Sequence, residues 1–184
     1  MATQYDALND TLTKFITDQH IFFCGTAGSE GRVNVSPKGM DSLRVLGPKR
    51  IIWRNLTGSG NETAGHLAQI NRITLMWCGF EAKPVILRAY GSAKTLHPRD
   101  AEFADLNAHF PPSIGARQIY DVTVEMVQTS CGYAVPFMEY AGERDVLKTW
   151  TEDKGEDGIS NYWETRNQNT IDGAPTYILD KDGH

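Results

Sequence analysis

The strongest candidate for a ligand site in this sequence is the stretch 53–63, which reads as the end of a strand, a Gly/Ser turn and the first turn of a helix. Ser59 followed by Glu62 has the spacing of a capping box, and Gly58 and Gly60 would let a ligand approach the main chain closely. A helix N-terminus has unpaired N–H groups and a partial positive charge, so the stretch predicts a phosphate site. The alternative is a capped helix that only joins two strands.

Hydroxyl, amide and cationic side chains close to this stretch could complete an anion site. Lys38 follows the second predicted strand and offers a mobile point charge. Arg54 and Trp53 lie on opposite faces of their strand, and the sequence leaves open which of them faces the core. Phosphate recognition uses these donor types. The candidate anion site consists of Ser36, Lys38, Arg54, Ser59, Asn61 and Thr63.

Other kinds of catalytic site have weaker support. The carboxylates between residues 152 and 157 are typical of a solvated surface. Cys24 and Cys78 lie in apolar strands, as small core residues do, and only Cys131 lies in a predicted loop. His20 and Cys24 lack the spacing and the third ligand of a metal site, so no metal is expected.

Composition bounds the class of protein. The chain has 184 residues, of which 40% are hydrophobic and 22% charged, as in a single globular domain. A formal net charge of −5 argues against a nucleic-acid partner. The cysteines are few and far apart, and there is no signal-peptide pattern or apolar run of membrane-spanning length. We therefore expect a cytoplasmic protein without a membrane partner.

The pattern of elements predicts an antiparallel barrel. Apolar or alternating runs indicate six strands, at residues 20–26, 32–36, 51–55, 73–80, 85–94 and 118–127. Helices are expected at residues 5–17, 62–70, 99–110, 143–149 and 156–166. Short connections favour a barrel with peripheral helices over a βαβ sheet. Residues 1–184 form a single domain, and the extension 130–184, too short and polar for a core of its own, is expected to pack on the barrel or on a partner subunit.

Three segments, 32–39, 52–63 and 71–76, resemble the FMN-binding split-barrel family related to pyridoxamine 5'-phosphate oxidase, and segments 130–136 and 169–175 are similar to a microbial and fungal branch of it. The resemblance implies a mainly β (α+β) fold, a six-stranded antiparallel split β-barrel, and a homodimer with FMN at its interface. It places Lys38 at the end of the second strand and Ser59 at the start of the phosphate loop. It also places Trp53, Arg54 and Asn55 at positions that touch FMN.

The phosphate loop departs from the family pattern. Related oxidases carry Ser-Arg-Lys there, whereas this chain has Ser59, Gly60 and Asn61, so two cationic ligands are missing. Backbone N–H groups, hydroxyls and the two cations on neighbouring strands would have to compensate. The predicted cofactor-binding residues are Ser36, Lys38, Trp53, Arg54, Asn55, Thr57, Gly58, Ser59, Asn61 and Thr63.

The predicted function is that of an FMN-dependent oxidoreductase, which transfers hydride or electrons between flavin and an unidentified small molecule. The vitamin B6 oxidase activity is not implied, because the C-terminal substrate-binding motif of those oxidases has no counterpart here. One alternative is a flavin- or haem-binding carrier or sensor without turnover. Another is a structural protein whose loop only caps a helix.

Overall fold

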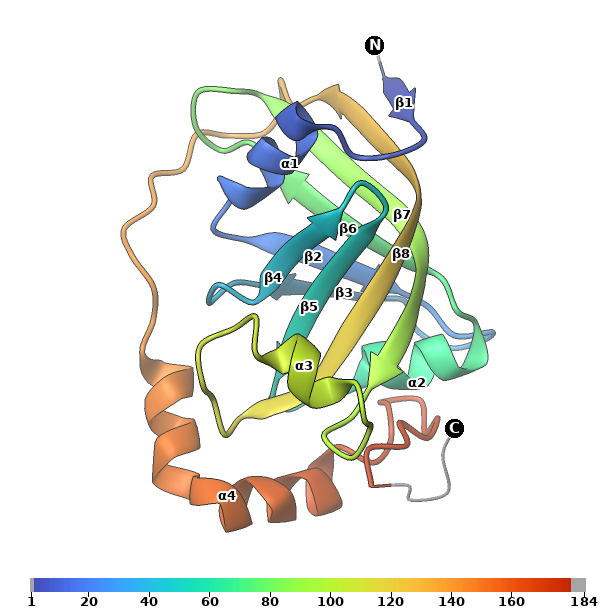
Figure 1. Ribbon diagram of the computed structural model, residues 1–184, viewed down its shortest axis with the longest axis vertical. Helices are drawn as coiled ribbons and strands as arrows, with labels where there is room; N and C mark the ends of the chain where they lie inside the picture. The colour runs from blue at the N-terminus through green and yellow to red at the C-terminus, as the bar shows by residue number, and fades with distance from the viewer. Residues whose placement is uncertain (1, 180–184) are drawn as a thin grey trace.

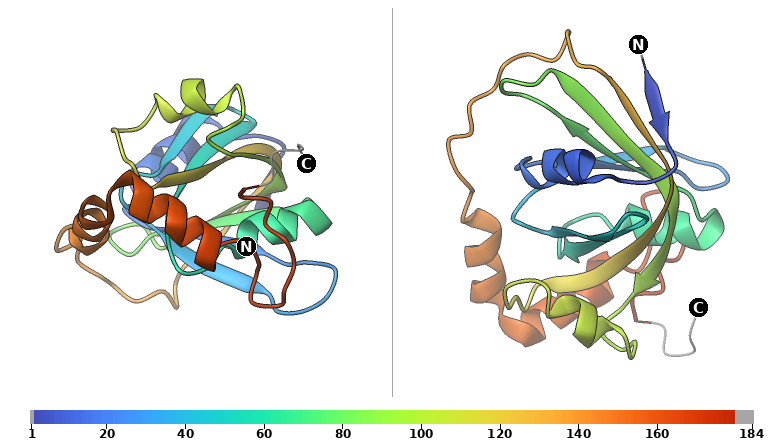
Figure 2. Two further views of the ribbon diagram at one scale, coloured as in Figure 1. Left: turned by 90° about the horizontal axis from the view of Figure 1, so that it is seen from below. Right: turned by 45° about the horizontal axis from the view of Figure 1, so that its top comes forward.

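The fold is organised around one antiparallel sheet, which the computed structural model describes for residues 2–179 (Figure 1). In that range the sheet has eight strands, and the main path runs in the order β3-β2-β6-β7-β8-β5-β4, with β1 paired to β8. The sheet curls around a single interior, and β3 and β4 form the two ends of the path (Figures 1 and 2). The strands are β1 Thr3–Tyr5, β2 Phe22–Thr26, β3 Asn34–Lys38, β4 Leu43–Gly47, β5 Arg50–Leu56, β6 Ile73–Cys78, β7 Val85–Leu96 and β8 Ala116–Cys131.

The long strand β8 connects the two halves of the sheet. From Ile119 to Cys131 it pairs with β7, whereas its other edge pairs first with β5 and then with β1. The register shifts between Tyr90 and Gly91, where the sequence predicted a bulge. A Cβ atom at Gly91 would collide with the carbonyl oxygen of Thr123 on β8, so only glycine allows the two strands to approach there.

Four helices surround the sheet in the described range. They are α1 Asp10–Thr17, α2 Glu62–Gln69, α3 Phe103–Asn107 and α4 Val146–Arg166. In α4, Gly155 has φ 63° and interrupts the helical backbone, so α4 consists of two helical pieces. The extended linker 132–145 leads from β8 to α4, which crosses the lower end of the barrel (Figures 1 and 2). No helix in the described range is long and apolar enough to cross a membrane.

The core has two parts, one on each face of β5. Trp53 belongs to the larger cluster inside the barrel, where it packs with Phe22 and Tyr120. Ile52 belongs to a smaller cluster under α3, with Phe103 and other residues. This alternation follows from the period of two along a strand, and it decides which side chains of β5 lie inside the barrel.

The predicted fold class is confirmed, but the strand count is not six. The short strands β1 and β4 were missed because neither alternates clearly, and each is defined by pairing with a distant or following strand. The first helix begins at Asp10 rather than residue 5, because Asn9 caps it by accepting a hydrogen bond from the Leu12 amide at 2.9 Å. The helix predicted at 99–110 is confined to α3.

Candidate functional site

The 58–61 loop joins β5 to the N-terminus of α2. The chain leaves β5 at Thr57, whose amide and hydroxyl both donate to the carbonyl oxygen of Gly115, at 2.8 and 3.0 Å. The predicted capping box is wrong, because Asn61 is the N-cap residue and no side chain caps the helix. The Glu62 carboxylate accepts a hydrogen bond from the Ile171 amide (3.1 Å) instead. The first-turn N–H groups of α2 therefore have no side-chain acceptor in the described part of the chain.

Two buried side chains hold this loop by its carbonyl oxygens. Arg117 donates to the carbonyl oxygens of Gly58 (3.1 Å) and Gly60 (2.9 Å). Asn167 donates from Nδ2 to the Gly58 oxygen at 3.0 Å, and its Oδ1 accepts from Arg117 at 2.8 Å. The side chain of Asn61 is turned away from the helix and donates to the Asn167 carbonyl oxygen at 3.0 Å. The conformation of the loop therefore depends on β8 and on the C-terminal tail.

The inner face of β3 adds polar side chains to the same region. Asn34, Ser36 and Lys38 alternate with the exposed Val33 and Val35, so the polar residues point toward the interior. The Ser36 hydroxyl donates to Asn34 Oδ1 at 2.8 Å. The Lys38 ammonium lies 5.1 Å from the centre of the Trp53 ring. Burial lowers the pKa of Lys38, and the positive charge of Arg117 lowers it further.

Thr63, in the first turn of α2, faces Cys24 on β2. Their side-chain oxygen and sulfur atoms are 3.8 Å apart. Burial raises the pKa of the Cys24 thiol to about 11, so the thiol is protonated and unreactive at neutral pH. Thr63 and Cys24 therefore join β2 to the helix N-terminus beside the polar row of β3.

Asn55 lies inside the barrel with two residues of β8. Its Nδ2 donates to Gln118 Oε1 at 3.0 Å, and the Tyr120 hydroxyl donates to the same oxygen at 3.4 Å. Gln118 is fully buried, and its Nε2 donor has no partner among the described residues. A buried amide donor without an acceptor is costly and is commonly found where a ligand or water supplies the acceptor.

The structure does not bring Trp53 and Arg54 to the loop. The Trp53 side chain is 1% exposed and stacks on Tyr120 with ring centres 4.7 Å apart, so it is a core residue. The Arg54 guanidinium lies on the opposite face of β5, where it donates to the Pro111 carbonyl oxygen at 2.5 Å and covers the Phe110 ring. Burial lowers the pKa of Arg54. The loop cation predicted at Arg54 is instead supplied by Arg117.

Two cations, Lys38 and Arg117, lie near the loop, and the Glu62 carboxylate beside Gly60 accepts from the Ile171 amide. Within residues 2–179, no ion pair forms between a carboxylate and Lys38 or Arg117. Arg117 is 2% exposed, and burial lowers its pKa to about 10. Its Nε atom has no partner in the described part of the chain. Among the described residues neither of these two buried or half-buried cations has a carboxylate partner, and together with the nearby donors they form an arrangement that suits an anion. No metal-binding cluster is found among the described residues.

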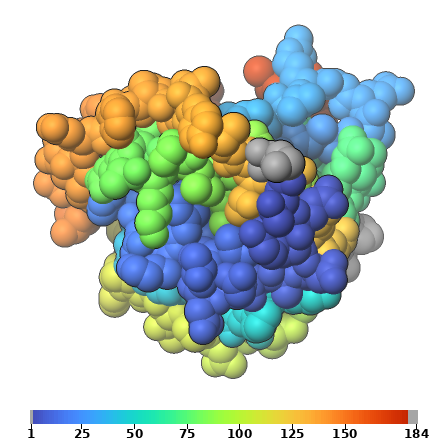
Figure 3. All heavy atoms as spheres, turned by 90° about the horizontal axis from the view of Figure 1, so that it is seen from above, coloured from blue at the N-terminus to red at the C-terminus, as the bar shows by residue number. Residues whose placement is uncertain are grey.

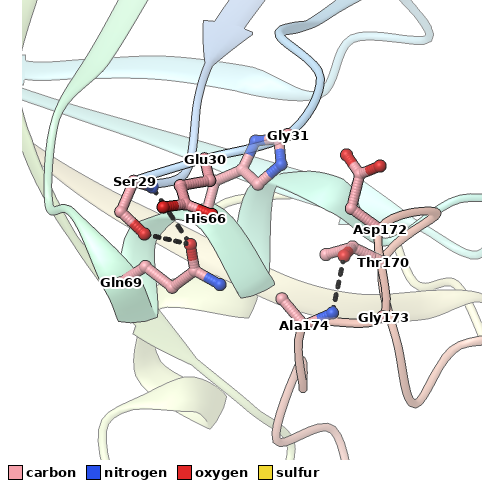
Figure 4. A pocket seen from close by; sticks show the side chains of 9 residues that line it. All are labelled: Ser29, Glu30, Gly31, His66, Gln69, Thr170, Asp172, Gly173 and Ala174. Atoms are coloured by element: carbon pink, nitrogen blue, oxygen red, sulfur yellow. Dashed lines mark hydrogen bonds between the residues drawn. The ribbon is translucent and has the colours of Figure 1, made fainter.

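Two pockets lie beside this region rather than within it. One, of about 430 Å³, is formed by the β2–β3 connection, α2 and the tail, and His66 and Asp172 are among its residues (Figure 4). The other, of about 670 Å³, lies between α2, β7 and the segment around Arg99. None of the predicted cofactor-binding residues lines either pocket.

Sequence reasoning missed three residues of the site: Arg117, Gln118 and Asn167. Arg117 and Gln118 stand at the start of an alternating strand, where a polar pair carries no local signal. Asn167 lies in a polar tail, and its contacts with the loop join residues more than 100 positions apart. Only the folded chain shows these contacts.

Comparisons with known proteins agree with this architecture. The family model of pyridoxamine 5'-phosphate oxidase matches residues 8–131. Over 140 residues the chain is 35% identical to the pyridoxamine 5'-phosphate oxidase family protein ustO of Aspergillus flavus; the match covers 73% of this chain and 56% of that protein. The chain therefore spans little more than half the length of this relative.

Solved structures show the same fold at low identity. HupZ of Group A Streptococcus superposes with a TM-score of 0.52 and 17% identity, covering 65% of this chain and 91% of that one. A Lactobacillus delbrueckii protein provisionally assigned as a pyridoxamine 5'-phosphate oxidase gives a TM-score of 0.53 and 16% identity, covering 67% and 94%. At this identity the likeness shows the fold alone.

Proposed function

This chain belongs to the pyridoxamine 5'-phosphate oxidase family, and we propose that it is a flavoprotein that binds FMN through the 58–61 loop. One observation carries the proposal. The loop, the uncapped N-terminus of α2 and the polar face of β3 form a donor-rich region with two cations, neither of which has a carboxylate partner within residues 2–179. Such a region fits the phosphate and ribityl hydroxyls of FMN.

Each group in the region has a different role in the proposal. The backbone N–H groups of the loop and of the first turn of α2 would bind the phosphate, as they do at other helix N-termini. Lys38 and Thr63 would add an ammonium and a hydroxyl from neighbouring elements. Ser36, Asn55 and the unpartnered Nε2 of Gln118 would bind hydroxyl or carbonyl groups of the flavin.

The activity proposed for the bound protein is that of an oxidoreductase. FMN would supply hydride and electron transfer, and the protein would supply binding, orientation and electrostatics. The Cys24 thiol is protonated and buried, so it does not act as a nucleophile. The small-molecule substrate is not identified by these residues.

A second copy of the chain would complete the site in this proposal. Val33, just before β3, and Val35, on its outer face, are 71% and 64% exposed. The linker 132–145 stands out on the surface, and it exposes Tyr133 and Phe137 at 84% and 86% (Figure 3). Exposed apolar patches of this kind mark interfaces. Sedimentation of the purified protein should give the mass of a dimer, and Val35→Lys should shift it toward the monomer.

The test of cofactor binding is direct. Protein purified without added ligand should show flavin-type absorbance, and mass spectrometry of the released ligand should identify FMN. Apoprotein should quench the fluorescence of added FMN with saturable binding. A colourless protein that does not take up FMN would refute the proposal, and a Soret band would identify haem instead.

A further inference from the structure

The 58–61 loop is held from one side only. Three of its carbonyl oxygens point toward Arg117 and Asn167: those of Gly58, Ser59 and Gly60, the Ser59 contact being the longest at 3.4 Å. Because both anchoring side chains are almost completely buried, these contacts fix the inner side of the loop. Every peptide bond in the described chain is trans.

The geometry of a trans peptide then decides where the amides point. In each peptide the N–H group is directed opposite to the carbonyl group. The N–H groups of Ser59, Gly60 and Asn61 are therefore directed away from Arg117 and Asn167. Within residues 2–179 none of these three amides donates to a protein acceptor, and Ser59 and Gly60 are exposed. The loop thus presents the adjacent unpaired N–H groups of Ser59 and Gly60 at its outer surface, whereas Asn61 is 2% exposed.

Arg117 contributes charge as well as position. It forms no ion pair with any described carboxylate, and its Nη atoms are used by the loop carbonyls and by Asn167. Its positive charge therefore lies directly behind the outward N–H groups and is poorly screened, because the guanidinium is buried. Polarised carbonyl groups make the amides of the same peptides better donors.

We propose that Arg117 and Asn167 are positioning residues for the phosphate of the cofactor: they clamp the loop carbonyls so that the loop amides form the phosphate cradle, and neither touches the phosphate. This inference rests on the proposed FMN function. It makes the C-terminal tail, which lies beyond the segment 8–131 shared with the family model, a part of the cofactor site. The clamp selects phosphorylated flavin over riboflavin, because riboflavin has no group for the cradle.

The tail is built to keep Asn167 in place. The Asn167 carbonyl oxygen accepts from Asn61 Nδ2 at 3.0 Å and from the Thr176 hydroxyl at 2.6 Å. Farther along, Arg99 donates to the carbonyl oxygens of Tyr177 and Ile178, both at 2.7 Å. The Arg99 contacts anchor the tail without touching the loop, so Arg99→Met is a matched control for loss of tail hydrogen bonds.

The experiment compares the affinities of the full chain for FMN and for riboflavin by fluorescence titration. Asn167→Ala should raise the Kd for FMN roughly 10- to 100-fold, the loss expected for misplaced hydrogen bonds to a charged group, and change the Kd for riboflavin less than about threefold. Arg117→Met should act in the same selective way. Arg117→Lys keeps the charge but cannot bridge two carbonyl oxygens, so its effect should be intermediate. Arg99→Met should leave both affinities within about twofold.

The outcomes separate the inference from the proposed function. The clamp would be overturned if Asn167→Ala lost equal affinity for FMN and for riboflavin. It would also be overturned if folded Asn167→Ala and Arg117→Met lost no affinity for FMN. Neither result would contradict FMN binding by the wild-type protein. Failure of the wild-type protein to bind FMN would overturn both. If Asn167→Ala does not fold, Arg117→Lys carries the same comparison, because it retains the charge and most of the volume.

Discussion

Replacing Lys38 by methionine should have opposite effects on the stability of the apoprotein and on FMN binding. The ammonium of Lys38 is half-buried, lies over Trp53 and has no hydrogen bond or ion pair among the described residues. Burial already lowers its pKa, which means that the fold disfavours the charged form. A residue kept in this state is expected to serve a ligand.

The magnitudes follow from this environment. Partial desolvation of an unpaired ammonium costs on the order of 1–2 kcal/mol, and the contact with the Trp53 ring returns about 0.5–1 kcal/mol. Methionine keeps the packing of the stem, so Lys38→Met should stabilise the apoprotein by about 0.5–1 kcal/mol. Loss of a charge-assisted hydrogen bond to phosphate should weaken FMN binding by about 1.5–3 kcal/mol, or roughly 10- to 150-fold.

The pH dependence gives the sign of the stability effect independently. The pKa of Lys38 in the folded chain is below the ordinary value of 10.5, so the cost of holding the charge is fully present below the folded pKa. That cost disappears as pH rises through the folded pKa toward 10.5. The advantage of Lys38→Met in the apoprotein should therefore shrink as the solution becomes alkaline.

The assay is urea unfolding of the apoproteins together with FMN titration at low and high salt. Lys49→Met removes the same charge from an exposed position and is the matched control. Control and wild type should agree within about 0.5 kcal/mol in stability and about twofold in affinity. A Lys38→Met apoprotein less stable than wild type, or an FMN affinity equal to wild type, would refute the reasoning.

Three further predictions concern other parts of the chain. Burial, helped by the charge of Arg99, lowers the pKa of His97 to about 4, so the unfolded chain binds more protons than the folded chain between pH 6.5 and 4. As the pH falls through that window, the free energy of unfolding should therefore fall by up to about 3 kcal/mol. Urea unfolding of His97→Gln should show a smaller loss over the same window. Gly91→Ala, which forces a Cβ atom onto the Thr123 carbonyl oxygen, should lower the urea midpoint by the equivalent of about 2–4 kcal/mol. A thiol reagent should label one cysteine rapidly in the native protein, and Cys131→Ser should abolish that labelling, because the other two cysteines are buried.

Local signals were enough for the elements built from neighbouring residues. The hairpin of β2 and β3 and the helix α2 were predicted close to their observed bounds, because apolar runs and glycine turns specify them. The strand β4 was not predicted, because Leu43–Gly47 has a uniform half-buried pattern and is defined by its pairing with β5. The two helical pieces of α4 were expected from the sequence, and Gly155 separates them.

Within the candidate site, some residues likewise have a local sequence signal and others have none. Lys38 and Thr63 were named from the sequence, and the structure places both beside Cys24, because one ends β3 and the other begins α2. Arg117 and Asn167 carry no comparable signal, since their role depends on contacts with a loop 57 to 109 residues away. The capping-box prediction was wrong for the same kind of reason. Ser59 and Glu62 have the right spacing, but the Glu62 carboxylate accepts a hydrogen bond from the Ile171 amide in the tail instead.

The alternation of side chains along β5 decides whether that strand can supply a positive charge to the loop. Trp53 and Arg54 must face opposite sides of β5, and the sequence left open which side is the interior. Pairing of Trp53 with Tyr120 on β8 places the aromatic side chain inside the barrel and sends Arg54 to Pro111. A cation from β5 is then excluded from the loop. Apart from Lys38 on β3, the positive charge comes from Arg117 on β8, which donates to the loop carbonyl oxygens from the inner side, so the loop amides remain free to meet a phosphate from the outside.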